Sequence, residues 1–223
     1  MIQNRLLPVA VKILLLMIAG WSIVAVADDK LRRHQVSNFA SGSLLGWQQK
    51  SFQGHTAYQL LAIDGRQALK ASSQASASAL YRSVQVDLTQ TPLLNWSWRV
   101  DTVDPSLDPL QKAGDDFPAR IYVVKKGFFA WQTKALNYVW ANSHSDLAYW
   151  PNPFTASAVM IPVKAGREGL GQWHHQQVDV RADFMRVFNT SVDQIDGVAI
   201  MSDSDNAKGA TRAYFAELYF SRN

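Results

Sequence analysis

The chain contains no cysteine, and this absence excludes several kinds of chemistry at once. Without thiols the fold has no disulfides, and neither thiolate metal sites nor redox-active cysteine pairs can form. Charged residues are also scarce, at 18%, whereas hydrophobic residues make up 48% of the 223 residues. This balance is typical of a folded chain with a packed core and not of a disordered one. The length suits one domain, or at most two small ones.

Common catalytic patterns are missing as well. There is no Gly-x-Ser-x-Gly for a hydrolase nucleophile and no glycine-rich loop for phosphates. His174 and His175 are adjacent, so on a strand their rings point to opposite faces, and no histidine spacing fits a zinc site. A large charge excess is absent too, because the formal net charge is only +4. We therefore predict no nucleic-acid partner.

The first residues have the pattern of a secretory signal peptide. Arg5 and Lys12 supply positive charge, residues 13–26 form an uncharged apolar run, and Ala25-Val26-Ala27 fits a small-x-small cleavage site. The alternative is a retained membrane anchor, but this run of 14 residues is shorter than the ~20 that a spanning helix needs. We therefore predict cleavage after residue 27, no permanent membrane anchor, and a single periplasmic or secreted domain over residues 28–223.

Apolar residues alternate with polar ones along much of the remaining chain, which indicates strands. The clearest case is 94–100, where Leu94, Trp96, Trp98 and Val100 share one face. We expect about eleven short strands, one short helix over 183–188, and long loops over 101–116 and 142–154. Because helices do not separate the strands, parallel crossovers are not expected. The predicted fold is all-β: an antiparallel β-sandwich of the jelly-roll type with one short helix.

Five segments occur in an order that resembles a known family. They read Trp96-Ser97-Trp98-Arg99-Val100, Gly114-Asp115-Asp116-Phe117, Ala119-Arg120-Ile121-Tyr122-Val123-Val124, Leu136-Asn137-Tyr138-Val139-Trp140-Ala141 and Met201-Ser202-Asp203-Ser204-Asp205-Asn206. Together they resemble the exported bacterial proteins of the domain-of-unknown-function family 3047. That family has no established activity, so the resemblance implies a fold and no reaction. The layout is more distantly similar to galactose-binding-like sandwiches, which include carbohydrate-binding modules and often carry a structural calcium.

Polar residues on apolar strands are the main sign of chemistry. Arg99 and Arg120 lie within two predicted strands, and Asp115 and Asp116 directly precede the second strand. If these strands pair, both guanidinium groups share one layer, where their planar forks hold carboxylates or sugar hydroxyls in two-point contacts. The alternative is a structural ion-pair network, because buried arginines need partners whatever their function.

Asp203, Asp205 and Asn206 place oxygen atoms close together in sequence, which suits a hard cation such as calcium. The calcium loop with glycine at its sixth position and glutamate at its twelfth is absent, so the alternative is an Asx turn. A hydrolase that pairs the carboxylates of Asp116 and Asp203 is a further alternative. We predict no cofactor, and a structural calcium stays an alternative that no motif supports.

Aromatic rings form the third set of candidates, since exposed rings can stack on the apolar C–H faces of sugars. Trp98, Tyr138 and Trp140 lie on predicted strands, whereas Trp131 and Trp150 lie in connecting segments. The alternative is core packing, which the alternation favours for Trp98. Trp150, in a proline-rich loop, is the ring expected to be exposed.

These observations predict a non-catalytic binding or accessory protein that recognises a glycan or another polar envelope component. The predicted ligand-binding residues are Trp98, Arg99, Asp115, Asp116, Arg120, Tyr138, Trp140, Asp203 and Asp205. Two alternatives stay open. One is a glycan hydrolase that uses the acids as general acid and base. The other is a structural module for a protein partner, which would present a large exposed apolar patch. The sequence favours no particular oligomeric state.

Overall fold

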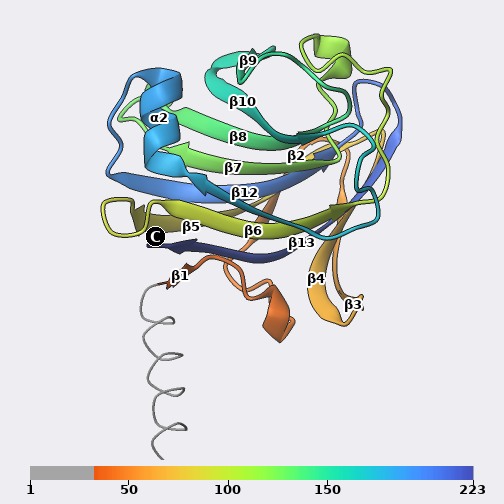
Figure 1. The fold of residues 1–223 in the computed structure, drawn as a ribbon, viewed down its shortest axis with the longest axis horizontal. Helices are drawn as coiled ribbons and strands as arrows, with labels where there is room; N and C mark the ends of the chain where they lie inside the picture. Colours follow the sequence, from red (N-terminus) through yellow and green to blue (C-terminus); the bar gives the residue numbers. More distant parts are fainter. Residues whose placement is uncertain (1–32, 223) are drawn as a thin grey trace, which may run out of the picture. The chain divides into compact units, whose positions relative to one another are not determined.

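The structure, a computed structural model, describes residues 33–222, and from His34 onward they form one compact unit. The predicted signal peptide over 1–27 lies outside the described residues and stays a prediction. Within 33–222, no helix combines the length and the apolar character needed to cross a membrane. The strands form two sheets that lie face to face, with a short helix at one end (Figure 1).

The first sheet consists of β1 (Arg33–Gln35), β3 (Ala57–Ile63), β4 (Arg66–Gln74), β6 (Leu93–Val100), β11 (His174–Asp179) and β13 (Ala210–Ser221). The second consists of β2 (Gln48–Gln53), β5 (Ala77–Asp87), β7 (Ala119–Lys125), β8 (Lys134–Ala141), β9 (Trp150–Asn152), β10 (Thr155–Ala165) and β12 (Gln194–Asp203). The helical elements are α2 (Val180–Phe188) and the 3-10 turns η1 (Phe39–Ser41), η2 (Lys112–Gly114) and η3 (Ala130–Gln132).

The six-stranded sheet has the order β11-β6-β13-β4-β3, with β1 also paired to β13. The seven-stranded sheet has the order β2-β5-β12-β7-β8-β10-β9. This arrangement confirms the predicted all-β sandwich. One expectation was wrong, because β10 pairs with β8 in parallel. The segment 142–154, which includes β9, supplies the crossover length that a helix usually provides between parallel strands.

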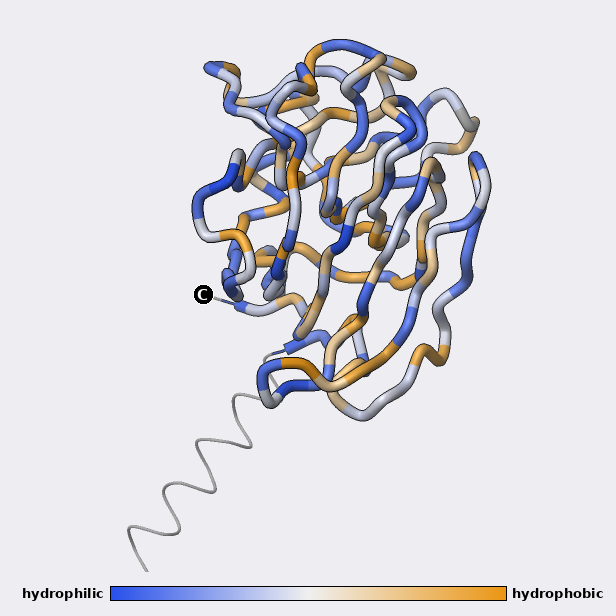
Figure 2. The backbone as a smooth tube through the Cα atoms, turned by 90° about the vertical axis from the view of Figure 1, so that its right-hand side faces the viewer, coloured by the Kyte–Doolittle hydropathy of each residue, from blue (hydrophilic) through white to orange (hydrophobic). Residues whose placement is uncertain are grey.

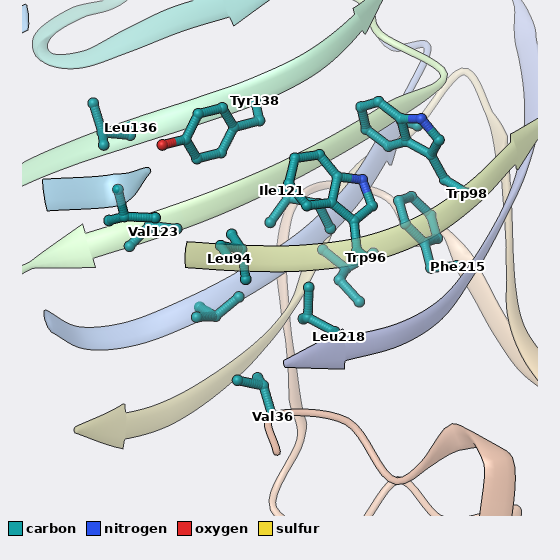
Figure 3. Close-up of a cluster of buried hydrophobic side chains, with 14 of the residues drawn as sticks. Val36, Leu94, Trp96, Trp98, Ile121, Val123, Leu136, Tyr138, Phe215 and Leu218 are labelled. Atoms are coloured by element: carbon teal, nitrogen blue, oxygen red, sulfur yellow. The ribbon is translucent and has the colours of Figure 1, made fainter. Parts of the chain in front are cut away.

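The core lies between the two sheets and is built from alternate residues of their strands. On β6, Leu94, Trp96, Trp98 and Val100 are fully buried, as the alternation predicts. Figure 3 shows Trp96 pointing toward Tyr138 of β8 across this layer, and their ring centroids lie 5.7 Å apart. Figure 2 shows hydrophobic and hydrophilic stretches interleaved along the strands. One aromatic-rich layer therefore holds the two sheets together.

Helix α2 begins at a side-chain cap, and this cap gives a testable prediction. The Asp179 carboxylate accepts a hydrogen bond from the Ala182 N–H at 2.9 Å. We expect Asp179→Ala to lower the free energy of unfolding by about 1 kcal/mol, because one backbone donor loses its partner. Urea denaturation measures the loss. Asp179→Asn should keep most of the stability, and the exposed loop variant Asp146→Ala should change little. Equal losses in Asp179→Ala and Asp179→Asn would contradict the cap.

Candidate binding pocket on the outer face of the seven-stranded sheet

The outer face of the seven-stranded sheet carries the polar residues that the sequence singled out. Ile121 and Val123 of β7 belong to the main core, so Arg120 and Tyr122 point to the opposite face. Met201 of β12 lies on that same outer face, where it packs with Tyr122 in a small apolar cluster separate from the core. Strand alternation thus places one arginine, one tyrosine and one methionine side by side on the outside of the sandwich.

A cavity of about 350 Å³ lies on this face. Its buried apolar lining comes from Ala77 and Met201, next to the half-buried Tyr122. Two exposed rings complete it: Phe52 of β2 is 62% exposed, and Phe154, in the turn between β9 and β10, is 58% exposed. The cavity therefore combines a buried apolar base with aromatic rings that are accessible to solvent, as small-molecule sites often do.

Arg120 is the centre of the polar lining. It is 1% exposed, and its Nε donates to Asp203 Oδ1 at 2.8 Å while its Nη2 donates to Asp203 Oδ2. Nη2 also donates to the backbone carbonyl of Asp115, and Nη1 donates to the Tyr122 hydroxyl at 3.2 Å. The Arg120 guanidinium lies over the Phe117 ring, 4.4 Å from its centroid. This is the two-point arginine–carboxylate geometry, closed off from water.

Burial shifts the pKa of two carboxyls in this network. It raises the pKa of Asp203 to about 7, although the Arg120 guanidinium opposes the shift. Burial also raises the pKa of Asp115, again against Arg120, and the Asn152 amide donates to both Asp115 oxygens at 3.2 and 3.3 Å. Asp205 adds a third acid to the lining. One arginine thus faces three carboxyls, so the pocket disfavours further negative charge.

Asp116, although predicted as a ligand-binding residue, holds a loop in place instead of lining this cavity. Its Oδ1 accepts from the backbone and side-chain N–H groups of Asn206 at 3.0 and 3.1 Å, and its Oδ2 accepts from the Ala207 N–H at 2.6 Å. It is buried. The Asp116 side chain therefore fixes the loop that follows β12, and with it the positions of Asp205 and Asn206 beside the pocket.

Asp116, Asp203 and Asp205 are the residues in the described chain that could hold a metal ion. Each offers one carboxylate oxygen, and these oxygens lie within 4.8 Å of one another. Protein donors already bind two of the three, since Arg120 holds Asp203 and backbone N–H groups hold Asp116. The prediction of no cofactor stays a prediction.

Arg99 does not join the site, contrary to the expected pairing of its strand with that of Arg120. Its strand β6 belongs to the six-stranded sheet, whereas β7 belongs to the seven-stranded one. The Arg99 guanidinium instead pairs with Asp64 at 2.7 Å and Asp101 at 3.0 Å, where it is partly exposed. The predicted shared layer of two arginines was wrong because the strands belong to different sheets.

The predicted sugar-stacking rings also lie elsewhere. Trp98, Tyr138 and Trp140 are fully buried between the sheets, so these rings belong to the core. Trp150, expected to be exposed, is 3% exposed and packs with Phe117 and other residues in a separate apolar cluster. The loop that contains Trp150 forms β9 and pairs with β10. This pairing buries the Trp150 ring.

Sequence reasoning missed the rings that do line the pocket. Phe52 is a lone aromatic on the otherwise polar strand β2, and that isolation is a signal of an exposed ring. Asn152 and Phe154 belong to the same proline-rich segment as Trp150, but only Trp150 was predicted to be an exposed ring in this segment. Tyr122 and Met201 alternate with core residues on their strands, so their outward direction follows from the period of two.

One family model matches residues 45–219, which is most of the chain. The chain belongs to this family. It is described as "Protein of unknown function (DUF3047)", so the resemblance predicted from the five sequence segments is confirmed. Membership of the DUF3047 family assigns no reaction. No curated protein matches the chain.

Solved structures that are similar to this DUF3047 chain include carbohydrate-binding sandwiches. A family 11 carbohydrate-binding module of the cellulosomal cellulase Lic26A-Cel5E of Clostridium thermocellum has a TM-score of 0.47 and 9% identity, over 85% of this chain and 95% of that one. TmCBM61, solved in complex with beta-1,4-galactotriose, has a TM-score of 0.42 and 8% identity, over 85% and 99%. The xyloglucanase domain of NopAA from Sinorhizobium fredii, solved with cellobiose, has a TM-score of 0.45 and 8% identity, over 81% and 96%. At these values the similarities carry no conclusion about the pocket.

Proposed function

We propose that this chain is an exported, non-catalytic binding protein whose outer-face pocket takes an uncharged glycan segment. One observation carries the proposal. Two solvent-accessible rings, Phe52 and Phe154, line a cavity whose polar side is a fixed network of carboxylates, amides and one arginine. Sugars need this combination, because their C–H faces are apolar and their hydroxyls form hydrogen bonds.

The charge of the pocket selects among glycans. Asp115, Asp203 and Asp205 outnumber Arg120, and the guanidinium already donates to protein acceptors. Uronic acids and sulfated sugars would bring further negative charge to carboxyls whose pKa burial already raises. Neutral sugar hydroxyls can donate to the carboxylate oxygens of Asp115 and Asp205, which line the pocket. A neutral glycan, or another uncharged polyhydroxyl component of the envelope, is therefore the ligand class.

The positions of the acids favour binding over hydrolysis. A glycosidase needs two carboxyl groups that both face the scissile bond, one of them free to donate a proton. Asp203 has both oxygens bound to Arg120, and Asp116 has both oxygens bound to N–H groups of the loop after β12. The carboxylates of Asp116 and Asp203 therefore stabilise the fold, and this disfavours their use as the catalytic pair of a glycosidase. The proposal of export rests on the signal-peptide pattern of residues 1–27. Export would place the pocket in the compartment that contains envelope glycans.

Isothermal titration calorimetry of residues 28–223 against a panel of neutral and anionic oligosaccharides tests the proposal. We expect at least one neutral oligosaccharide to bind more tightly than its anionic counterparts. We also expect Phe52→Ala/Phe154→Ala to weaken that binding at least tenfold, which corresponds to about 1.4 kcal/mol. Because both rings are exposed, the melting temperature should change little.

A matched control removes two other exposed phenylalanines. Phe128→Ala/Phe129→Ala deletes rings that lie in the β7–β8 turn and not in the cavity. This variant should keep full glycan affinity. Failure of every neutral oligosaccharide to bind, or equal losses in the two double variants, would sink the proposal. Release of shorter sugars during the titration would instead support the hydrolase alternative.

A further inference from the structure

The turn between β7 and β8 exposes three large aromatic rings. Phe128 is 92% exposed, Phe129 is 53% exposed and Trp131 is 74% exposed. The Phe128 and Phe129 rings meet edge to face with centroids 4.9 Å apart, and the Phe129 and Trp131 rings are nearly parallel at 6.1 Å. Three contacting rings on one short turn form an exposed apolar cluster, and exposed clusters of this kind mark interaction sites.

Internal hydrogen bonds give this turn a defined shape. The Gly127 N–H donates to Thr133 Oγ1 at 3.4 Å, and the Phe129 N–H donates to Gln132 Oε1 at 3.1 Å. A Cβ atom at Gly127 would lie 2.3 Å from that of Gln132, so the two ends of the turn touch. The rings are thus presented by a closed turn. The side-chain oxygens of Gln132 and Thr133 accept hydrogen bonds within it.

Positive charge surrounds the base of the turn. Lys125 and Lys126 precede the rings and Lys134 follows them, and the chain has no acidic residue from 117 to 145. Lys125 pairs with Asp196 at 3.1 Å, while Lys126 is exposed. Lys134 donates to Thr190 Oγ1 beyond the end of α2. Three lysines therefore flank the apolar tip in the sequence; Lys125 is paired with an acid, Lys134 is bonded to a neutral threonine, and Lys126 is exposed.

We propose that the β7–β8 turn docks the protein on an anionic lipid surface. Aromatic rings favour the membrane–water interface, where their apolar bodies leave water while the headgroup region stays polar. The exposed Lys126 would then face negatively charged headgroups, a contact worth about 1 kcal/mol near the surface. The combination of a small apolar insertion with basic residues is what reversible membrane binding requires. This surface is independent of the glycan pocket.

The chemistry of the turn fits lipid better than sugar. A sugar site needs polar groups that meet the hydroxyls, as the Asp115 and Asp205 carboxylates do in the pocket. In the turn, the side-chain oxygens of Gln132 and Thr133 already accept from the turn's own N–H groups. The exposed ring surface and the charge of Lys126 match the two parts of an anionic lipid interface.

Co-sedimentation of residues 28–223 with vesicles tests the proposal. The chain should bind vesicles of phosphatidylglycerol and phosphatidylcholine in equal amounts, and bind far less to phosphatidylcholine alone. Phe128→Ser/Phe129→Ser/Trp131→Ser should weaken the apparent affinity at least tenfold. Lys126→Gln should weaken it about fivefold at low ionic strength and much less in 1 M salt. The melting temperature of all variants should stay close to the wild-type value, because these side chains are exposed.

The pocket variant Phe52→Ala/Phe154→Ala is the matched control and should bind the vesicles like the wild type. The variant with all three turn rings replaced should keep any glycan affinity. The lipid proposal and the glycan proposal can therefore be refuted separately. The proposal is overturned if the wild type ignores phosphatidylglycerol, or if the triple variant binds as well as the wild type. Capture of a protein partner through the turn without vesicle binding also overturns it.

Discussion

Above about pH 7, where Asp203 is ionised, Arg120→Ala is expected to lower the free energy of unfolding by about 3–5 kcal/mol, the cost of removing one partner from a buried ion pair. Asp203 is 2% exposed, and both of its oxygens accept from Arg120. Without the guanidinium, the Asp203 carboxyl keeps the Phe117 N–H at 3.1 Å as a donor, and the Asp115 carbonyl keeps the Asn206 amide at 3.4 Å, but both lose their cationic partner. The carboxyl must then either stay charged without a cation or take up a proton. Chemical denaturation with two probes measures the loss.

The pH dependence of this loss has a definite sign. The folded pKa of Asp203 is about 7, above its ordinary value, so the folded state holds a proton that the unfolded state releases. Wild-type stability should therefore fall as the pH rises from about 4 to about 7. Arg120 is the main group that opposes this shift, so its removal raises the pKa further. In the variant, the fall should continue above pH 7, and the difference between the two proteins should grow there.

A second arginine of the chain provides the control. Arg99 also pairs with two aspartates, but it is 20% exposed and Asp64 is 50% exposed. Arg99→Ala should therefore cost less than about 1 kcal/mol, as exposed ion pairs usually do. If Arg120→Ala does not fold, Arg120→Met/Asp203→Leu should restore part of the stability, because it removes one of the two buried carboxyls that lose their cation. Losses of the same size for Arg99→Ala and Arg120→Ala would refute the buried-pair account.

The fold could be predicted from local patterns because most of its contacts follow from strand alternation. Residues 94–100 show this directly, since the period of two identifies the four side chains of β6 that face the core. The Asp64-Gly65 turn likewise joins β3 and β4 as a hairpin. The parallel pairing of β8 with β10 could not be predicted in the same way. It depends on how segment 142–154 returns along the sheet edge, which no local pattern encodes.

The candidate site could be predicted only in part, for a related reason. Asp115, Arg120 and Asp203 were found because charges on apolar strands must meet partners, and they do meet. The same reasoning failed for Arg99, because it gives no information about which sheet a strand joins. Phe52 was missed because its role depends on a neighbour, Phe154, that lies 102 positions away in the sequence and is brought near by the fold.

Trp98→Ala is the second large effect, with an expected loss of about 3–5 kcal/mol from the cavity it leaves. The Trp98 ring is fully buried and packs against Trp96 at 5.3 Å, Trp140 at 6.0 Å and Phe215 at 6.5 Å between ring centroids. Within residues 33–222 its indole N–H has no hydrogen-bond partner, so the expected loss is one of packing. Urea denaturation followed by circular dichroism measures it.

Trp131→Ala deletes a ring of the same size that is 74% exposed, and it should change the stability by less than about 0.5 kcal/mol. The contrast separates the two roles that a tryptophan in this sequence can have. Under conditions where Trp98→Ala is still folded, it should bind glycan with wild-type affinity, because its ring lies between the sheets and the pocket lies outside them. If a stably folded Trp98→Ala protein had lost its glycan affinity, the Trp98 ring would have to be part of the binding site, and the outer-face pocket would be wrong.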